Sequence, residues 1–318
     1  MVEIHSTVRH IQVAGADLGT AGRLKIALIS SLVVIDTIWI AASDFEFDLR
    51  SLAKVAAVTI ALVAISWFYR VKRPIRQFET LCTETAFLLA FSASAAVFSV
   101  LMTSIGLPLV DDRLMAIDAE LGFDWLAYVG FVNDRPWLGV ASSLVYVTTI
   151  SQVALTVVAV GMLGHLQRVQ RFVLSVMFGA LICIVISALL PAAGALGTIR
   201  PSPDFIAANN PVVDLEYKQA FFDLRDGLGR LISLDEPRGL IAFPSYHSTL
   251  SVLVVLAFVG AGRWFWLVLA LNLAVIFSTP VDGGHHLVDV IGGIAVAFAA
   301  WALAGRFFAV RTFIRAGS

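Results

Sequence analysis

The strongest constraint on the fold is a series of eight long apolar runs. They are Leu24–Ala42, Leu52–Tyr69, Thr85–Leu107, Trp137–Leu163, Phe172–Pro191, His247–Gly260, Trp264–Ser278 and His285–Ala304. A helix needs about 20 apolar residues to cross the hydrocarbon core of a bilayer. The runs therefore predict an all-α, polytopic transmembrane bundle of about eight spans. The sixth and seventh runs are short, and the tight joint between them, Gly260 to Arg263, predicts a helical hairpin.

Composition agrees with a membrane protein and excludes other classes. Hydrophobic residues make up 59% of the 318 residues and charged residues 14%, whereas a soluble domain has roughly 45–50% and about 25%. The net charge is −1 and there is no basic stripe, so we expect no nucleic acid partner. Cys82 and Cys183 are the only cysteines, which leaves no disulfide framework and no thiolate metal site.

The distribution of charge predicts the orientation of the spans. Basic residues recur on one side: Arg9, Arg23, Lys25, Arg70, Lys72, Arg73, Arg76, Arg168, Arg171, Arg263, Arg306, Arg311 and Arg315. The opposite loops carry Asp44, Glu46, Asp48, Asp111, Asp112, Asp118, Glu120, Asp124 and Asp134. Because Lys and Arg are retained in the cytoplasm, we expect both termini there. Residues 1–23 contain no cleavable signal pattern, so the first run is expected to stay as an anchor.

Two segments outside the spans carry a pattern of their own. Between Leu109 and Pro136, apolar residues recur at helical spacing among acidic ones, which predicts an interfacial helix, either a packed connector or a lid over a lipid headgroup. The loop over residues 192–242 is the longest, and such loops usually have a role. If its middle is helical, Lys218 and Arg225 lie two turns apart on one face. Hydroxyls and amides of the fourth run, Tyr146 among them, are expected mainly as contacts between helices.

Two clusters that contain histidine flank the sixth and seventh runs, and both fall on the extracytoplasmic side. His285 and Asp289 are four residues apart and share a helical face, so the carboxylate can orient the imidazole as a nucleophile or base. A purely structural hydrogen bond is the alternative, and His286 is a second possible partner of Asp289. His247 follows Pro244 in the first turn of the sixth run, either as a structural histidine or beside a helix N-terminus suited to phosphate.

Together these residues predict covalent phosphoryl transfer. One oriented imidazole attacks phosphorus, and the other histidine moves the proton. Lys218 and Arg225 are donors suited to phosphate oxygens, unless they are merely solvated. Nothing in this set calls for a metal or another cofactor.

The motifs resemble those of the type 2 phosphatidic acid phosphatase superfamily. Its second motif reads Pro-Ser-Gly-His, and Pro244 to His247 matches it except for Tyr246 in place of Gly. Its first motif reads Lys, six residues, Arg-Pro; Lys218 and Arg225 stand at that interval, followed by Asp in place of Pro.

The third motif reads Ser-Arg, five residues, His, three residues, Asp. Ser278, His285 and Asp289 stand at those spacings, whereas Thr279 takes the place of the Arg. The charge that this Arg supplies must then come from elsewhere. The candidates are Arg225 and the end of the sixth span, followed by Arg200 and Arg238.

The resemblance implies a role for each residue. His285 would be the nucleophile, Asp289 its orienting carboxylate, and His247 the acid and base. Lys218, Arg225 and Ser245 would bind phosphate, with His286 and Ser278 as further site residues. The family is metal-independent and acts on lipid phosphates or pyrophosphates in the outer half of the membrane, by hydrolysis or by headgroup transfer to an alcohol acceptor.

Several features are similar to the inositolphosphotransferase-like branch, which includes fungal inositol phosphorylceramide synthases. They are the relaxed motifs, two extra N-terminal spans and the paired histidines before Leu287. The segment from Leu109 to Trp125 looks typical of bacterial members. On this basis the chain divides into a cytoplasmic segment (1–23), N-terminal spans (24–108), a phosphatase or phosphotransferase core with the interfacial helix and active-site loops (109–305), and a cytoplasmic tail (306–318).

Two rival functions stay open. The first is a metal-binding or transport protein in which His247, His285, His286 and Asp289 form a zinc site. The second is a catalytically inactive relative.

Overall fold

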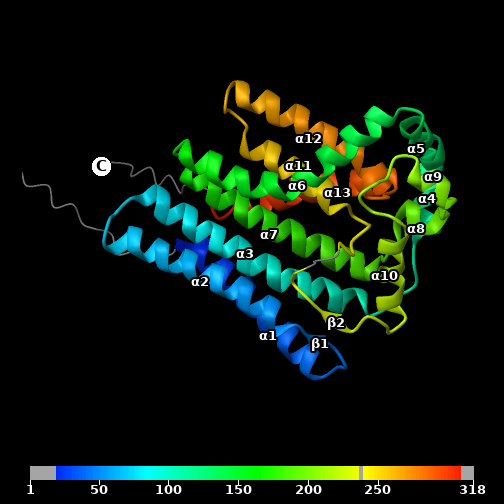
Figure 1. Ribbon diagram of the computed structural model, residues 1–318. Helices are drawn as coiled ribbons and strands as arrows, with labels where there is room; N and C mark the ends of the chain where they lie inside the picture. The colour runs from blue at the N-terminus through cyan, green and yellow to red at the C-terminus, as the bar shows by residue number, and fades with distance from the viewer. Residues whose placement is uncertain (1–18, 236–238, 309–318) are drawn as a thin grey trace, which may run out of the picture.

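The computed structural model describes residues 19–235 and 239–308, and within them the chain is a helical bundle with one short pair of strands (Figure 1). The helices are α1 (Gly19–Ala41), α2 (Leu49–Val71), α3 (Arg76–Thr103), α4 (Asp111–Glu120), α5 (Trp125–Asn133), α6 (Pro136–Met162), α7 (Leu166–Leu189), α8 (Gly194–Ile199), α9 (Pro203–Ala207), α10 (Leu215–Arg225), α11 (Tyr246–Ala257), α12 (Arg263–Asp282) and α13 (Leu287–Gly305). The strands are β1 (Glu46–Phe47) and β2 (Leu231–Ile232). Arg238 and most of the two predicted terminal segments lie outside the described residues.

Seven of the described helices, α1, α2, α3, α6, α7, α12 and α13, are long and apolar enough to cross a membrane, which confirms a polytopic membrane protein. The prediction of an eighth span over His247–Gly260 was wrong about its length. Helix α11 has 12 residues, about 18 Å at 1.5 Å per residue, against a hydrocarbon core of about 30 Å. It stops early because the chain reverses through Gly260 and Gly262, whose φ angles are +82° and +61°.

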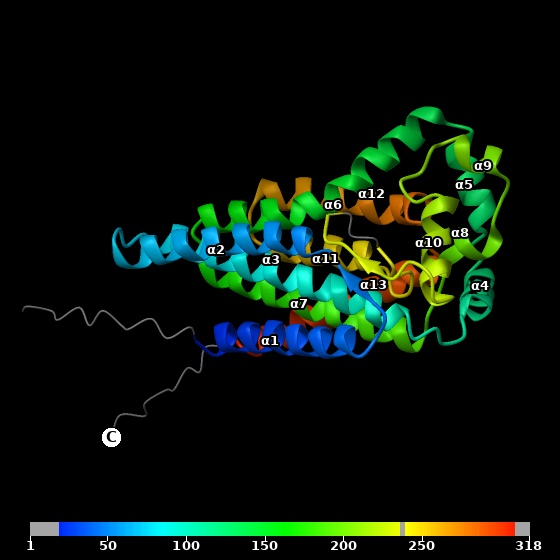
Figure 2. The ribbon, with the colours of Figure 1, turned by 60° about the horizontal axis from the view of Figure 1, so that its bottom comes forward.

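Helix α7 lies in the middle of the bundle, between α3, α11 and α13 (Figures 1 and 2). Its side chains Phe172, Leu174 and Met177 are completely buried. Helix α2 packs against α3 and leaves most of its surface exposed, as a lipid-facing helix does. The core around α7 fixes the position of α11, which carries His247, and of α13, which directly follows His285 and His286.

A buried ion pair joins the first helix to the bundle. Lys25 of α1 donates to Glu84 of α3, and the two residues are 1% and 3% exposed. A charge inside the membrane is costly unless it is paired, so this contact fixes how α1 packs on α3. Lys25 therefore does not contribute to the cytoplasmic surface charge that its position in the sequence suggested.

Helices α4, α5, α8, α9 and α10 gather at one end of the bundle, opposite the end where α1 begins and α13 finishes (Figures 1 and 2). We call this group the cap. The predicted interfacial helix is two helices, α4 and α5, separated at Gly122, whose φ is +75°. The long loop contains α8, α9, α10 and β2, and β2 pairs in parallel with β1 from the first outer loop. The segment with Lys218 and Arg225 is helical and forms α10.

Candidate active site

The start of α13 positions His285 and Asp289. Asp289 lies in the first turn, and its Oδ2 is 3.2 Å from His285 Nδ1. The same oxygen accepts a hydrogen bond of 2.9 Å from the backbone N–H of His286. Because the backbone anchors this carboxylate, Asp289 can hold the imidazole in one orientation. Nδ1 is thereby engaged, and Nε2 is the nitrogen left for chemistry.

Helix α4 braces this turn from the cap. Asp118 accepts hydrogen bonds of 2.9 Å from the backbone N–H groups of Leu287 and Val288, the first residues of α13. Asp111, two turns earlier, accepts 2.9 Å bonds from the backbone of Ala193 and Gly194 at the start of α8. The two carboxylates satisfy donors that helix N-termini leave unpaired. They therefore tie the turn that follows His285 to the cap.

His286 lies between these two carboxylates. Its Nδ1 is 3.4 Å from Asp118 and its Nε2 is 3.5 Å from Asp111, and the residue is 1% exposed. Burial acts to lower the pKa of His286, but the close contact with Asp111 and the nearby charges of Asp289, Asp111 and Asp118 outweigh it and raise the pKa above its ordinary value. Burial raises the pKa of Asp111, and the contact with His286 and the hydrogen bond from the backbone of Ala193 reverse that effect and lower it. His286 thus acts as a cationic link between α13 and α4.

His247 lies in the first turn of α11, stacked on a tyrosine. The rings of His247 and Tyr146 of α6 are 4.2 Å apart and 19° from parallel. The Tyr146 hydroxyl is 3.2 Å from His247 Nδ1. A Cβ placed on Gly283 would lie 2.8 Å from the Tyr146 hydroxyl and 2.5 Å from Cδ2 of His285. The hydroxyl and the second imidazole therefore approach the same glycine, which brings the two histidines to one site.

Lys218 of α10 supplies a cation from the cap. Its Nζ is 3.4 Å from the position that a Cβ on Gly194 would take, and the carbonyl of Gly284 is 2.6 Å from that position. The amine therefore lies close to the loop that leads into His285. Burial lowers the pKa of Lys218 to about 8, in spite of the negative charges of Asp289 and Asp111, which raise it. The amine is mainly protonated at neutral pH.

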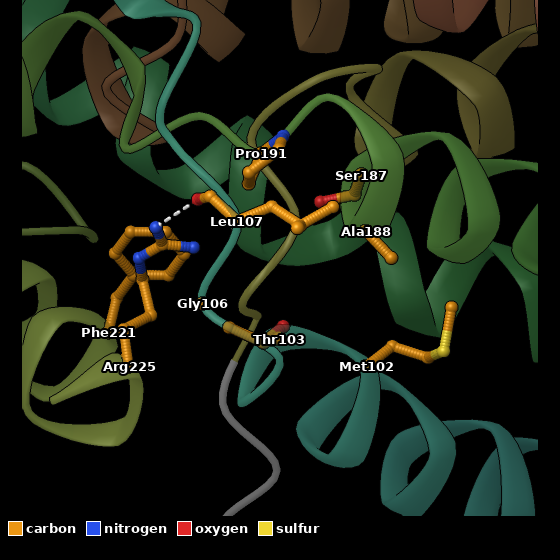
Figure 3. Close-up of a pocket in the computed structure, with 9 residues that line it drawn as sticks. All are labelled: Met102, Thr103, Gly106, Leu107, Ser187, Ala188, Pro191, Phe221 and Arg225. Carbon is orange, nitrogen blue, oxygen red and sulfur yellow. Dashed lines mark hydrogen bonds between the residues drawn. The ribbon is translucent and has the colours of Figure 1, made fainter. Parts of the chain in front are cut away.

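Arg225 is placed differently, although it shares a face of α10 with Lys218. Its guanidinium donates to the carbonyl of Leu107 and lies over the ring of Phe221, 5.4 Å from the centroid. Figure 3 shows it turned toward that carbonyl in a shallow hollow whose other side includes Ser187 and Pro191. Arg225 here fixes α10 to the segment that follows α3.

Three hydroxyl residues of the motifs are engaged inside the helices. Ser245 is completely buried; its Oγ accepts from the backbone of Ser248 and its N–H donates to the carbonyl of Asp289. Its N–H is therefore not the free phosphate donor that the sequence suggested. Ser278 and Thr279 both donate to the carbonyl of Val275, at 2.8 Å. Thr279 therefore does not replace the phosphate-binding Arg of the third motif. Arg200, another candidate, is exposed and lies over the ring of Phe222 at 4.7 Å.

Sequence reasoning missed the residues that hold the histidine loop in place. Asp282 is completely buried and accepts from Ser142 and Ser143 of α6, the second at 2.6 Å. Asp111 and Asp118 are seven residues apart on α4, a spacing that puts both on one face and could have indicated a shared partner. Tyr146 gave no such signal, because its contact with His247 joins residues 101 positions apart.

The comparisons with known proteins identify the family. A sequence model of the PAP2 superfamily matches residues 112–303, well over half of the chain. The chain belongs to the PAP2 superfamily. The match runs from α4 to α13 and includes both histidine clusters, whereas α1–α3 precede it. No curated protein and no solved structure gives a match.

Membership in the PAP2 superfamily confirms the broad resemblance and implies a metal-independent phosphatase with a phosphorylated substrate. Within the part of the chain that the structure describes, no group of three or more His, Cys, Asp and Glu side chains is placed to hold a metal ion. The predicted zinc site of His247, His285, His286 and Asp289 is therefore not formed there.

Proposed function

We propose that this PAP2 protein is a lipid phosphatase or phosphotransferase of the inositolphosphotransferase-like branch, acting through a phosphohistidine at His285. The observation that carries the proposal is the pair of His285 and Asp289 at the start of α13, with a second histidine and a buried lysine at the same end of the bundle. A hydrogen bond to Nδ1 leaves the Nε2 lone pair available, as in other oriented histidines.

In the first step, Nε2 of His285 bonds to phosphorus as the ester P–O bond breaks. Burial and the nearby charge of His285 lower the pKa of His247 to about 3, so this step requires the negative charge of the bound phosphate to raise it again. Protonated His247 then gives its Nε2 proton to the departing alkoxide, which leaves as an alcohol. Asp289 stabilises the positive imidazole ring that forms on His285, as the triad aspartate does in serine proteases. Each proton transfer of this kind contributes roughly 10²–10⁴-fold to the rate.

In the second step, neutral His247 takes a proton from water or from an acceptor hydroxyl. The oxygen bonds to phosphorus, the P–N bond to His285 breaks, and His247 is again protonated. Lys218 is our candidate for the phosphate oxygens in both steps, since its amine reaches the loop before His285. It supplies part of the charge that the Arg of the third motif gives in other members.

A cavity in the cap supports a lipid as the substrate. It has a volume of about 530 Å³ and lies between α4, α5 and α8. Its lining is mainly apolar and includes the polar side chains of Asp118, Asp124 and His286. An apolar cavity with a few polar groups suits an amphiphilic ligand.

The charge distribution supports an extracytoplasmic site. Basic residues such as Arg73, Arg168 and Arg263 lie at the helix junctions remote from the cap, whereas α4 carries Asp111, Asp112 and Asp118. The positive-inside rule then puts the cap and the histidines outside, with both termini cytoplasmic.

The proposal is tested with the detergent-purified protein and a panel of lipid phosphates in the presence of EDTA. We expect phosphate release or headgroup transfer by the wild type, none by His285→Ala, and wild-type rates for His165→Ala. His165 is an exposed histidine at the start of α7, outside the cap, and serves as the matched control. Free phosphate as product indicates hydrolysis, and a new phosphodiester indicates transfer. Turnover that needs metal, or that survives loss of His285, contradicts the proposal.

A further inference from the structure

Tyr146 touches one catalytic candidate and approaches the other, and no family motif includes it. It comes from α6, is 4% exposed, and presents its ring to His247 and its hydroxyl to His247 Nδ1. The close stacking leaves His247 little freedom to rotate. The hydroxyl also lies 2.8 Å from the position of a Cβ on Gly283, and Cδ2 of His285 lies 2.5 Å from the same position.

We infer that Tyr146 is a positioning residue for His247: its ring fixes the plane of the imidazole, and its hydroxyl holds Nδ1 so that Nε2 faces the phosphoester. The inference rests on the proposed histidine mechanism. In that cycle His247 must alternate between an imidazolium and a neutral base at Nε2. A hydroxyl oxygen that accepts the Nδ1 proton in both forms keeps the proton at Nδ1, so that only Nε2 exchanges one.

Gly283 makes this arrangement possible. Its φ of −99° is accessible to any residue, so the backbone does not require glycine. The requirement is space, because a Cβ would come within 3 Å of both Tyr146 and His285. Asp282 anchors the same loop to α6 through Ser142 and Ser143, which lie four and three residues before Tyr146 on the helix. Helix α6 therefore fixes His247 directly and the His285 loop through its serines.

The test compares two substrates in the wild type, Tyr146→Phe, His247→Gln and the double variant. A lipid phosphate has a poor leaving group and needs His247 in both steps. In p-nitrophenyl phosphate the leaving group is p-nitrophenolate, which departs without a proton. Turnover of this substrate therefore needs His247 only in the second step. We expect Tyr146→Phe to reduce kcat on the lipid phosphate about 10–100-fold and to leave KM unchanged. The loss is smaller than that of a whole proton-transfer group, because His247 is weakened and not removed.

On p-nitrophenyl phosphate, Tyr146→Phe should keep a burst of nitrophenolate equal in amount to the enzyme. Only the steady-state rate of nitrophenolate release should fall. The double variant should be no slower than His247→Gln, because Tyr146 acts through His247. Tyr128→Phe is the matched control: its hydroxyl also joins two helices, donating to the carbonyl of Phe277 at 2.7 Å, and it should leave both phases unchanged.

Three results overturn the inference. They are loss of the burst in Tyr146→Phe, a steady-state rate of Tyr146→Phe equal to that of the wild type, and a rate loss in the double variant equal to the combined losses of the two single variants. A general packing defect is recognised by a lowered melting temperature or by equal losses in Tyr128→Phe, and it too counts against the inference. If the wild type itself gives no burst and no turnover on either substrate, the proposed function fails instead.

Discussion

Asp289 offers a graded test of how His285 is oriented. One oxygen, Oδ2, is the partner both of His285 Nδ1 and of the His286 backbone N–H. An Asn at this position can put its own oxygen there and keep both hydrogen bonds while losing the charge. A hydrogen bond to a charged group is worth about 1.5–3 kcal/mol and a neutral one about 0.5–1.5 kcal/mol. The difference of about 1–1.5 kcal/mol predicts that Asp289→Asn lowers kcat about 10-fold.

Asp289→Ala removes the whole bond. The same magnitudes predict a loss of about 10–150-fold in kcat. It also removes the acceptor for the His286 N–H at the start of α13, which costs about 1 kcal/mol of stability. The assay is single-turnover phosphate transfer on a lipid phosphate, with thermal unfolding in detergent measured in parallel. Two outcomes refute the reasoning: Asp289→Asn as fast as the wild type, or activity losses that only follow the fraction of unfolded protein.

The remaining predictions concern the lysine, the glycine and the second histidine. Burial lowers the pKa of Lys218 to about 8, so kcat/KM should fall as pH rises through about 8; Lys218→Arg, which stays charged, should move this limb to higher pH, and an unmoved limb would assign it to another group. Gly283→Ala should abolish phosphate release, because its methyl group would lie within 3 Å of Tyr146 and His285, whereas full activity would show that the loop can shift. The pKa of His286 is raised above 6.5 in the folded protein, so its stabilising charge is fully present below pH 6.5 and is lost as pH rises through the folded pKa. His286→Gln should therefore lower the melting temperature more at pH 6 than at pH 9, and an equal deficit at both values would contradict the cationic link.

The spacing of residues along the sequence predicted which side chains lie near one another within a short segment. The spacing of His285 and Asp289 predicted a contact on a shared helical face. The structure has the contact, but His285 lies in the loop before α13 begins at Leu287. The spacing of Lys218 and Arg225 likewise put both on one face of α10, but it could not reveal that the guanidinium is held by the carbonyl of Leu107. The partner of a long side chain depends on which segment packs against the helix, and that information is not local.

Contacts across the fold account for the rest. Asp118 caps α13 from 169 residues away, and Lys25 finds Glu84 across 59 residues. Neither pairing has a periodic signature. The length of α11 was overestimated because apolar residues continue past Ala257, although the two glycines that reverse the chain were visible in the sequence. An apolar run shows which residues can lie in lipid. The end of the helix, however, is set by the backbone conformation of the residues that follow it.

The most direct test of the central claim is to trap the phosphoenzyme. The wild type is mixed with a lipid carrying a ³²P-labelled phosphate, quenched in alkali, in which phosphohistidine survives, and the labelled peptide is identified by mass spectrometry. We expect label on His285, none in His285→Ala, and normal labelling in His165→Ala. Turnover without a labelled intermediate, or label on another residue, would contradict it.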